Sequence, residues 1–348
     1  MPPYKENRMN TQERDKKEAE VDALVKQKDT DAACRLLVAL VTEYAKEKNF
    51  KKAESLYNRL YEVDSMALTE IVRAGEIIEE EKSESVDREH LEIWSDLYGT
   101  LSTTEGNALY YSMKTKIFEA GEPIMEQGTF NSRLYFINKG EVKALYLQGD
   151  REILITMLMP GQIIGQMPFF TASVCTLSLV PMNRVKTSFL ETDVLKKWKN
   201  DVPALESRLY DYCMHNDPVK KALDEKNIER RTDRREKFFG RIKFVLLDKS
   251  GKSLGNAYSG EIADISVGGM SFIVKSPKKE SVRMLLGRRL RVIFDLPLKS
   301  HEKPHKIDQA MTVIAAQPQA FDDYSVHLRF DTKWAQKMMD AIDFSENL

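Results

Sequence analysis

A short arginine-rich segment and one turn hold the residues of this chain that are best suited to chemistry. Arg230, Arg231, Arg234 and Arg235 lie close together, and further along comes the segment Asp264-Ile265-Ser266-Val267-Gly268-Gly269. A planar guanidinium can bind a phosphate through two parallel hydrogen bonds. Lysine would supply the charge without this fork. The arginines therefore indicate a site for an anion.

The turn offers complementary groups. The carboxylate of Asp264 can accept hydrogen bonds from N–H groups of a ligand, or orient an arginine, and Ser266 can donate or accept at short range. Gly268 and Gly269 would let backbone amides approach a ligand and would permit a positive φ. Residues 226–243 contain eight basic and three acidic side chains, whereas the whole chain has a formal net charge of -1. An anion would therefore collect here.

The two motifs flank the start of a strand-rich region. Short apolar segments bounded by turn residues predict six strands, at residues 238–247, 258–264, 270–274, 289–294, 311–315 and 324–330. An amphipathic helix is predicted at residues 333–344. Together these elements predict a small six-stranded β-barrel that closes the chain.

The two motifs together resemble the RRxxxR and [DN]xSxxG signatures of PilZ domains. The defining positions are filled by Arg230, Arg231, Arg235, Asp264, Ser266 and Gly269. The resemblance implies a barrel that binds cyclic di-GMP through both motifs, with Arg234 and Gly268 beside them. Each motif alone has an ordinary alternative: an arginine run can be a solvated linker or a nonspecific nucleic-acid patch, and Asp-x-Ser-x-x-Gly can be a plain turn.

The central region also has a strand period. Between residues 116 and 189, short apolar stretches alternate with turn signals such as Asn138-Lys139-Gly140 and Pro160-Gly161, which predicts a barrel or jelly roll. The segments Phe118–Ile124, Leu134–Ile137 and Gly161–Gln166 resemble a cyclic nucleotide-binding domain of the catabolite activator type, over roughly residues 101–215.

The nucleotide pocket implied by this second resemblance is degenerate. The family uses a glutamate for the ribose hydroxyl and an arginine for the cyclic phosphate. Here Gln166, between Gly165 and Met167, stands at the glutamate position, and no arginine occurs between Arg151 and Arg184. A buried phosphate without a cation is heavily penalised. We therefore expect a dimerising or relay scaffold, with cyclic AMP binding as the alternative.

The first region is predicted to be helical. Residues 16–95 contain almost no proline or glycine, and large and small residues recur at helical spacing. The positions that resemble a tetratricopeptide helix pair are Leu37, Leu40, Tyr44, Ala53, Tyr57 and Leu60, followed faintly by Ile71, Ala74, Gly75 and Ile78. Both a peptide-binding groove and a generic helical cap fit this pattern.

A helix after the central barrel has an apolar stripe of Leu205, Leu209 and Tyr212. In the resembled family the corresponding helix forms a parallel dimer, which implies a homodimer here.

Composition excludes several classes of protein. The first residues lack the apolar stretch of a secretory signal, and no run is long enough to cross a bilayer, so we expect a cytoplasmic protein without a membrane partner. The cysteines at positions 34, 175 and 213 are far apart and in no metal-ligand spacing. No Walker loop or nucleophile elbow is present, so we expect no enzyme. Strand patterns occupy the place of a helix-turn-helix, which argues against a DNA partner.

We therefore predict a multidomain α+β protein. Residues 1–95 are predicted to form helical hairpins, residues 96–218 a cyclic nucleotide-binding-like jelly roll with flanking helices, and residues 219–348 a six-stranded PilZ-like barrel. The expected function is that of a cyclic di-GMP receptor that couples binding to interdomain rearrangement and to a protein partner. The alternatives are a cyclic AMP-responsive or dual regulator, and a ligand-independent scaffold.

Overall fold

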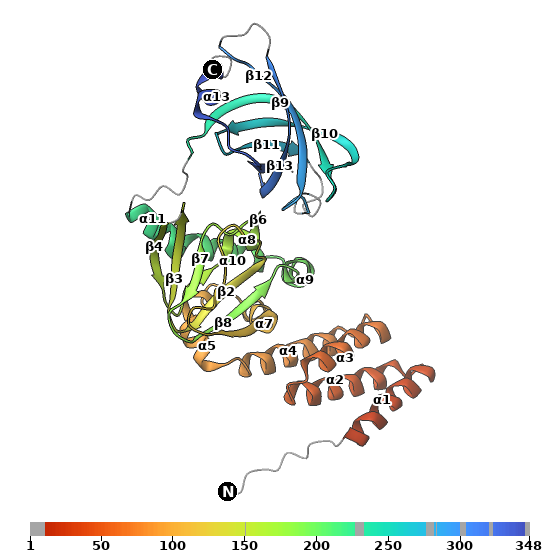
Figure 1. Cartoon of the computed structure of the whole chain (residues 1–348). Helices are drawn as coiled ribbons and strands as arrows, with labels where there is room; N and C mark the ends of the chain where they lie inside the picture. Colours follow the sequence, from red (N-terminus) through yellow and green to blue (C-terminus); the bar gives the residue numbers. More distant parts are fainter. Residues whose placement is uncertain are drawn as a thin grey trace. The chain divides into compact units, whose positions relative to one another are not determined.

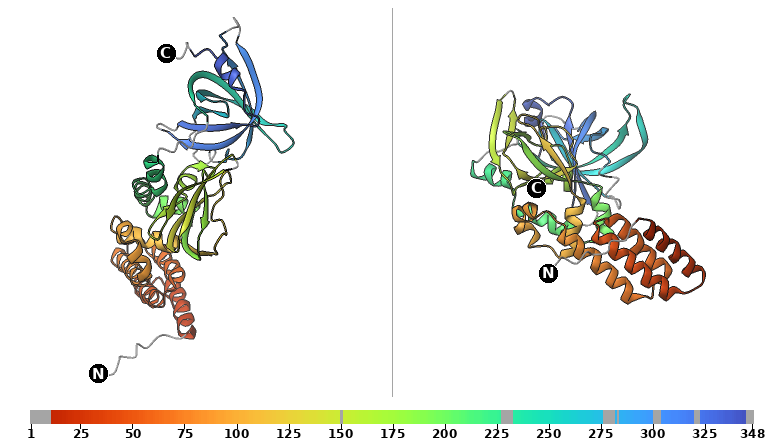
Figure 2. Two further views of the ribbon diagram at one scale, coloured as in Figure 1. Left: turned by 60° about the vertical axis from the view of Figure 1, so that its left-hand side comes forward. Right: turned by 90° about the horizontal axis from the view of Figure 1, so that it is seen from below.

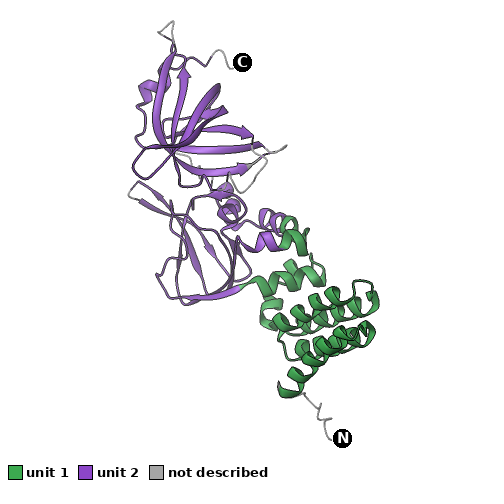
Figure 3. Ribbon diagram, turned by 90° about the vertical axis from the view of Figure 1, so that its right-hand side faces the viewer, with its two compact units in different colours: residues 1–113, 198–208 green, residues 114–197, 209–348 purple. Residues whose placement is uncertain are grey.

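The structure is a computed structural model of the 348-residue chain. It describes residues 11–149, 151–226, 233–275, 282, 284–299, 304–319 and 323–344. The chain divides into two compact units (Figure 3), one of residues 1–113 with 198–208 and one of residues 114–197 with 209–348.

The first unit is helical, as predicted. Its helices are α1 (Thr11–Lys26), α2 (Thr30–Lys46), α3 (Phe50–Val63), α4 (Leu68–Glu84), α5 (Arg88–Ile93), α6 (Ser95–Tyr98) and α7 (Thr103–Ser112). Helices α1 to α4 lie side by side (Figure 2). Asp29 and Asn49 begin α2 and α3 by accepting hydrogen bonds from the backbone N–H groups of Ala32 and Lys52. The apolar positions Leu37, Leu40, Tyr44, Ala53, Leu60, Ile71, Ala74 and Ile78 are buried in one core.

A glycine in the middle of α4 offers a test of this packing. A Cβ built on Gly75 would lie 3.4 Å from the hydroxyl oxygen of Tyr57, which is ordinary van der Waals contact. Glycine inside a helix costs roughly 0.5–1 kcal/mol relative to alanine. Gly75→Ala should therefore raise the free energy of unfolding by about that amount, measured by urea denaturation.

The matched control is Gly106 in α7. A Cβ there would lie 3.2 Å from a ring carbon of Tyr98, closer than the contact at position 75, so Gly106→Ala should gain less. A less stable Gly75→Ala protein would show that the α3–α4 contact is tighter than described.

The second unit begins with two small antiparallel sheets that enclose one apolar core, as predicted for the central region (Figure 1). One sheet has the order β1-β8-β2-β5 and the other β4-β3-β7. The bounds are β1 (Lys114–Phe118), β2 (Arg133–Lys139), β3 (Val142–Gln148), β4 (Arg151–Leu158), β5 (Ile163–Ile164), β7 (Ser178–Pro181) and β8 (Val185–Glu191). Between β5 and β7 lie the short helix α8 (Gln166–Phe170) and the two-residue strand β6 (Ala172–Ser173).

Three helices follow, α9 (Val194–Asp201), α10 (Leu205–His215) and α11 (Pro218–Glu225). Leu205 and Leu209 of α10 are fully buried in the single chain. The apolar stripe that we expected to pack against a second subunit is thus largely buried by residues of the same chain.

The start of the third region contains a helix that the predicted elements do not include, since Pro218–Glu225 form α11. Its start has the ordinary signals of a helix: the Asp217 carboxylate accepts hydrogen bonds from the N–H groups of Val219 and Lys220, and proline holds the first position.

The closing barrel has the six strands that the sequence predicts. They are β9 (Glu236–Leu247), β10 (Ser253–Ile265), β11 (Gly269–Lys275), β12 (Arg289–Leu296), β13 (His305–Pro318) and β14 (Asp323–Phe330). The order is β12-β9-β10-β11-β14-β13, and β12 pairs with β13 to close the barrel. Inward side chains from all six strands form its core.

Two elements of this barrel have other lengths than predicted. Strand β13 is much longer than residues 311–315, because it pairs with β12 through Thr312 and with both β14 and β6 further on. The closing helix α13 (Gln336–Ala341) is shorter than residues 333–344. The predicted six-stranded barrel is present despite these differences.

Candidate functional site

A β-bulge directs Asp264 outward. The pairing of β10 shifts between Ile262 and Asp264 against both β9 and β11. Ile262 and Ile265 are both in the barrel core although they are three positions apart, which strict alternation would not allow. The extra residue restores the inward face and leaves Asp264 on the outer face, and bulges commonly re-aim side chains at binding sites.

The bend between β10 and β11 is held by several hydrogen bonds. Both the N–H and the hydroxyl of Ser266 donate to the carbonyl oxygen of Gly269, over 2.8 and 3.1 Å. The carbonyl oxygens of Val267 and Gly268 accept from the N–H groups of Trp334 and Phe330. Ser266 therefore fixes the turn, and its hydroxyl is already engaged.

The two glycines of the bend serve close packing. Neither Gly268 nor Gly269 has the positive φ that we expected. A Cβ on Gly269 would instead lie 2.2 Å from the carbonyl oxygen of Leu328, and one on Gly268 would lie 2.6 Å from the carboxylate of Asp233. The backbone of β14 thus comes too close to Gly269 for any side chain there.

Arg235 reaches the bend. Its Nη1 lies 3.2 and 3.3 Å from the two carboxylate oxygens of Asp264, and both side chains are about a quarter exposed. The same Nη1 lies 3.4 Å from Nδ1 of His327, whose Nε2 lies 3.2 Å from the hydroxyl of Ser325. If Nδ1 accepts from the guanidinium, Nε2 carries the proton and donates to Ser325.

The other predicted arginines are placed differently. Arg234 is 88% exposed and pairs with Glu236, so it is not brought to Asp264. Arg230 and Arg231 lie outside the described residues.

Two further residues close to the bend were missed by the sequence motifs. His327 comes from β14, opposite Ser271, which in turn lies opposite Asp264. Lys333 binds the carboxylate of Asp233 over 2.8 Å. Their positions follow from strand pairing between distant segments, and no local signal in the sequence points to them.

The described groups near the bend form matched pairs of opposite charge. Arg235 faces Asp264, Arg234 faces Glu236, and Lys333 faces Asp233. The most exposed of them, Arg234 with Glu236, contributes little net stability, so this cation can exchange its carboxylate for an incoming anion at small cost. Asp264 can then accept from a ligand N–H. The arrangement suits an anionic ligand that has both acceptors and donors.

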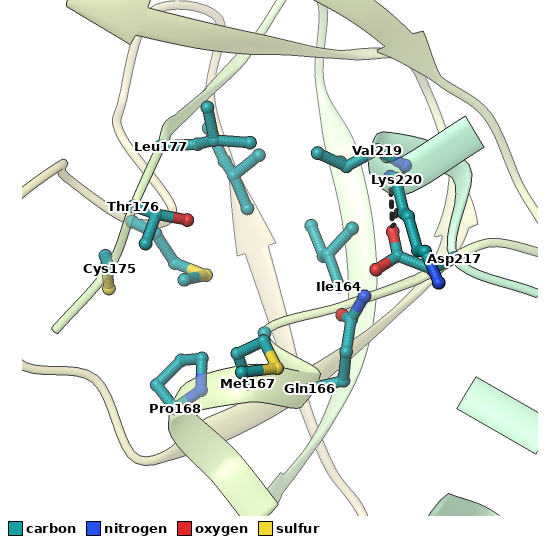
Figure 4. A pocket seen from close by; sticks show the side chains of 13 residues that line it. Ile164, Gln166, Met167, Pro168, Cys175, Thr176, Leu177, Asp217, Val219 and Lys220 are labelled. Atoms are coloured by element: carbon teal, nitrogen blue, oxygen red, sulfur yellow. Dashed lines mark hydrogen bonds between the residues drawn. The ribbon is translucent and has the colours of Figure 1, made fainter. Parts of the chain in front are cut away.

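A second site lies in the central domain. A cavity of about 80 Å³ is lined by Gly165, Gln166 and Met167, by the segment 175–177, and by the first turn of α11. In Figure 4 the segment 175–177 and the start of α11 face each other across the cavity, with α8 below. Gly165 has a φ of +88°, and a Cβ there would lie 2.5 Å from the carbonyl oxygen of Arg133.

The polar groups of this cavity are few. Gln166 is buried, and Lys220 is the cation among the described residues that line it. Burial raises the pKa of the Cys175 thiol, so this group is a poor nucleophile at neutral pH. No arginine lines the described cavity, so Lys220 is the group there that could neutralise a phosphate.

No cluster of His, Cys, Asp or Glu suitable for a metal ion occurs in the described ranges. None of the helices described has both the length and the apolar character needed to span a bilayer.

Comparison with known proteins identifies the two barrels. The family model of the cyclic nucleotide-binding domain matches residues 115–199, and that of the PilZ domain matches residues 229–342. Both families are ligand-binding regulatory domains. The chain is 28% identical over 103 residues to a CRP-like cAMP-activated global transcriptional regulator of Mycobacterium tuberculosis, found in two strains. That stretch covers 29% of this chain and 46% of the relative, so the chain spans about half the length of the curated relatives it matches.

Solved structures similar to the chain include a cyclic nucleotide-binding domain from Methylobacillus flagellatus, with 21% identity, a TM-score of 0.36, and coverage of 39% of this chain and 80% of that one. The catabolite activator protein of Thermus thermophilus has 20% identity and a TM-score of 0.33 and covers 38% and 61%. With TM-scores this low, the family models remain the basis of the assignment. The chain contains a cyclic nucleotide-binding domain followed by a PilZ domain.

Proposed function

We propose that the chain is a receptor for cyclic di-GMP and that its PilZ domain holds the ligand. The observation that carries this proposal is the Arg235 guanidinium beside the Asp264 carboxylate on the outer face of the barrel. These two groups come from the two sequence motifs and meet across 29 positions of the chain. Their contact brings the two motifs together at one point on the surface of the barrel.

The chemistry of the ligand matches this pair. A guanine has O6 and N7 acceptors for a guanidinium, and its ring N–H and amino group can donate to a carboxylate such as Asp264. The two phosphodiester charges require further cations, for which Arg230, Arg231 and Arg234 are the candidates that the PilZ signature and its neighbourhood provide. Ser266, Gly268 and Gly269 would shape the bend against which the ligand lies.

The output of binding is proposed to be a change in domain arrangement that is read by a protein partner. The arginine segment connects the two barrels along the chain, so a ligand bound to it can act on both. We propose boundaries near residues 95 and 218, a cytoplasmic location, and no catalysis or DNA binding. The homodimer rests on the family resemblance, since Leu205 and Leu209 are buried within one chain.

Parallel calorimetric titrations of the full chain with cyclic di-GMP, cyclic di-AMP and cyclic AMP test the proposal. We expect saturable binding of cyclic di-GMP. Cyclic di-AMP has the same charge, but its adenines lack O6 and present an amino donor in that place, so it should bind far more weakly. Absence of heat with cyclic di-GMP, or equal affinity for both dinucleotides, would reject the proposal.

The alternative functions are a cyclic AMP-responsive or dual regulator and a ligand-independent scaffold. The match of residues 115–199 to the cyclic nucleotide-binding family favours the cyclic AMP-responsive regulator, since the relatives of this chain include a regulator described as cAMP-activated. The 80 Å³ cavity and its lack of an arginine favour the scaffold role for this domain. The cyclic AMP titration distinguishes the two.

A further inference from the structure

Helix α11 packs into the central barrel as part of its core. Ala222 and Leu223 are both less than 10% exposed and belong to the same apolar cluster as the barrel strands, and Val219 packs against that cluster. These residues lie at positions i, i+3 and i+4, so one face of the helix is apolar. The opposite face, with Lys221 and Asp224, is exposed.

Both ends of the helix are fixed by hydrogen bonds. At its start, the Asp217 carboxylate accepts from the N–H groups of Val219 and Lys220, over 3.0 and 2.9 Å. Just beyond its last turn, Nζ of Lys226 donates to the carbonyl oxygen of Ile155 over 2.7 Å and lies 3.4 Å from that of Leu154. The helix is therefore anchored to β4, in addition to its apolar contact.

The start of α11 lines the cavity beside Gly165, Gln166 and Met167, the residues that resemble part of a nucleotide pocket. Asp217, Val219 and Lys220 line the cavity on the side opposite the segment 175–177, as Figure 4 shows. The cavity that remains has about 80 Å³, whereas pockets for small-molecule ligands begin at roughly 300 Å³. With the helix docked, the space that remains is smaller than an ordinary ligand pocket.

We propose that α11 is an internal occupant of the central pocket, so that this domain is closed to cyclic nucleotides until the helix undocks. Docking of the helix and binding of a cyclic nucleotide are then mutually exclusive. Any event that pulls α11 away would open the pocket, and any ligand that fills the pocket would release α11. This proposal does not depend on cyclic di-GMP binding at the PilZ domain.

The structure contains its own reporter for undocking. Cys175 lines the pocket and is 1% exposed, and burial raises the pKa of its thiol, so its reaction with iodoacetamide should be slow. Undocking of α11 would open the cavity beside it. Cys34, buried in the helical unit, serves as an internal control in the same sample. Peptide mass spectrometry distinguishes the two alkylation rates.

The test variant is Leu223→Ser in the full chain, with Lys221→Ala as matched control on the exposed face of the same helix. Loss of the buried leucine side chain should raise the alkylation rate of Cys175 by at least about tenfold and leave that of Cys34 unchanged. Lys221→Ala should leave both rates unchanged. Equal Cys175 rates in Leu223→Ser and the unaltered chain would overturn the proposal.

Hydrogen exchange separates undocking from unfolding of the barrel. In Leu223→Ser the amides of α11 should lose protection while those of β2 and β8 keep it. If the strands also lose protection, Lys226→Ala takes the place of Leu223→Ser as the test variant. This change removes the hydrogen bond to the carbonyl oxygen of Ile155 without altering the apolar core. An unchanged Cys175 rate in Lys226→Ala together with unchanged α11 exchange would then reject the proposal.

Cyclic AMP provides the decisive ligand measurement. If the unaltered chain binds cyclic AMP, hydrogen exchange of the α11 amides must increase on binding. Tight binding of cyclic AMP with α11 still protected would show that the helix does not occupy the ligand's place, and the proposal would fall.

Discussion

Arg235→Ala is expected to weaken cyclic di-GMP binding at least about tenfold. A hydrogen bond to a charged group contributes roughly 1.5–3 kcal/mol, and 1.4 kcal/mol corresponds to a factor of ten in affinity. Arg235 is the described arginine of the first motif that reaches the Asp264 carboxylate, 3.2 Å away. Isothermal titration calorimetry of the full chain measures the change. Arg231→Ala should have an effect of similar size, because the same signature includes this position.

Arg291→Ala is the matched control. Arg291 also pairs with an aspartate across neighbouring strands of the same barrel, since its Nε and Nη2 lie 2.7 Å from the two carboxylate oxygens of Asp308. Both changes remove one positive charge from the domain. Only the Arg235 variant should lose affinity. Equal loss in both would assign the effect to overall charge, and no loss in Arg235→Ala would remove this residue from the site.

Gly269→Ala is expected to destabilise the PilZ barrel by an amount at the upper end of the roughly 1–3 kcal/mol typical of overpacking. The new Cβ would lie 2.2 Å from the backbone carbonyl oxygen of Leu328 and 3.3 Å from its carbonyl carbon. These are backbone atoms of a central strand, so they cannot rotate away. Strands β11 and β14 would have to separate locally, with loss of the pairing of Gly269 with Arg329.

Gly268→Ala is the comparison that isolates this backbone clash. Its Cβ would meet a carboxylate oxygen of Asp233 at 2.6 Å, and a side chain can move, so the cost should stay within about 1 kcal/mol. Hydrogen exchange of peptides from β11 and β14 measures both variants. Equal protection in Gly269→Ala and the unaltered chain would mean that the two strands are further apart than described.

The fold class could be predicted from the sequence because its signals are local and repeated. Apolar residues at helical spacing between Leu37 and Ile78 lie on one face of each helix, and these faces form a shared core. Short apolar segments bounded by turn residues indicate the two strand-rich regions. Errors occurred where a single short element had to be recognised. Helix α11 was missed because its eight residues are mostly charged or small, although Asp217 and Pro218 mark its start.

The candidate site could be predicted only in part. The motifs predicted which residues belong to the site, and two of them, Arg235 and Asp264, do form an ion pair. The motifs could not show that Arg234 turns to Glu236, because these two residues are neighbours whose exposed side chains have many alternative positions. The role of Gly269 was also different from expectation, since it depends on the carbonyl group of a strand almost sixty residues away.

The sequence by itself determined the kinds of domain, their order, and the chemistry of the arginine and aspartate motifs, because these depend on residue type and local period. The tertiary structure alone decided which groups meet. His327 comes beside Arg235 through the pairing of β14 with β11, and α11 comes into the central pocket because its apolar face is buried there. Such contacts join distant segments, and they arise from the packing of the whole domain, which no local pattern encodes.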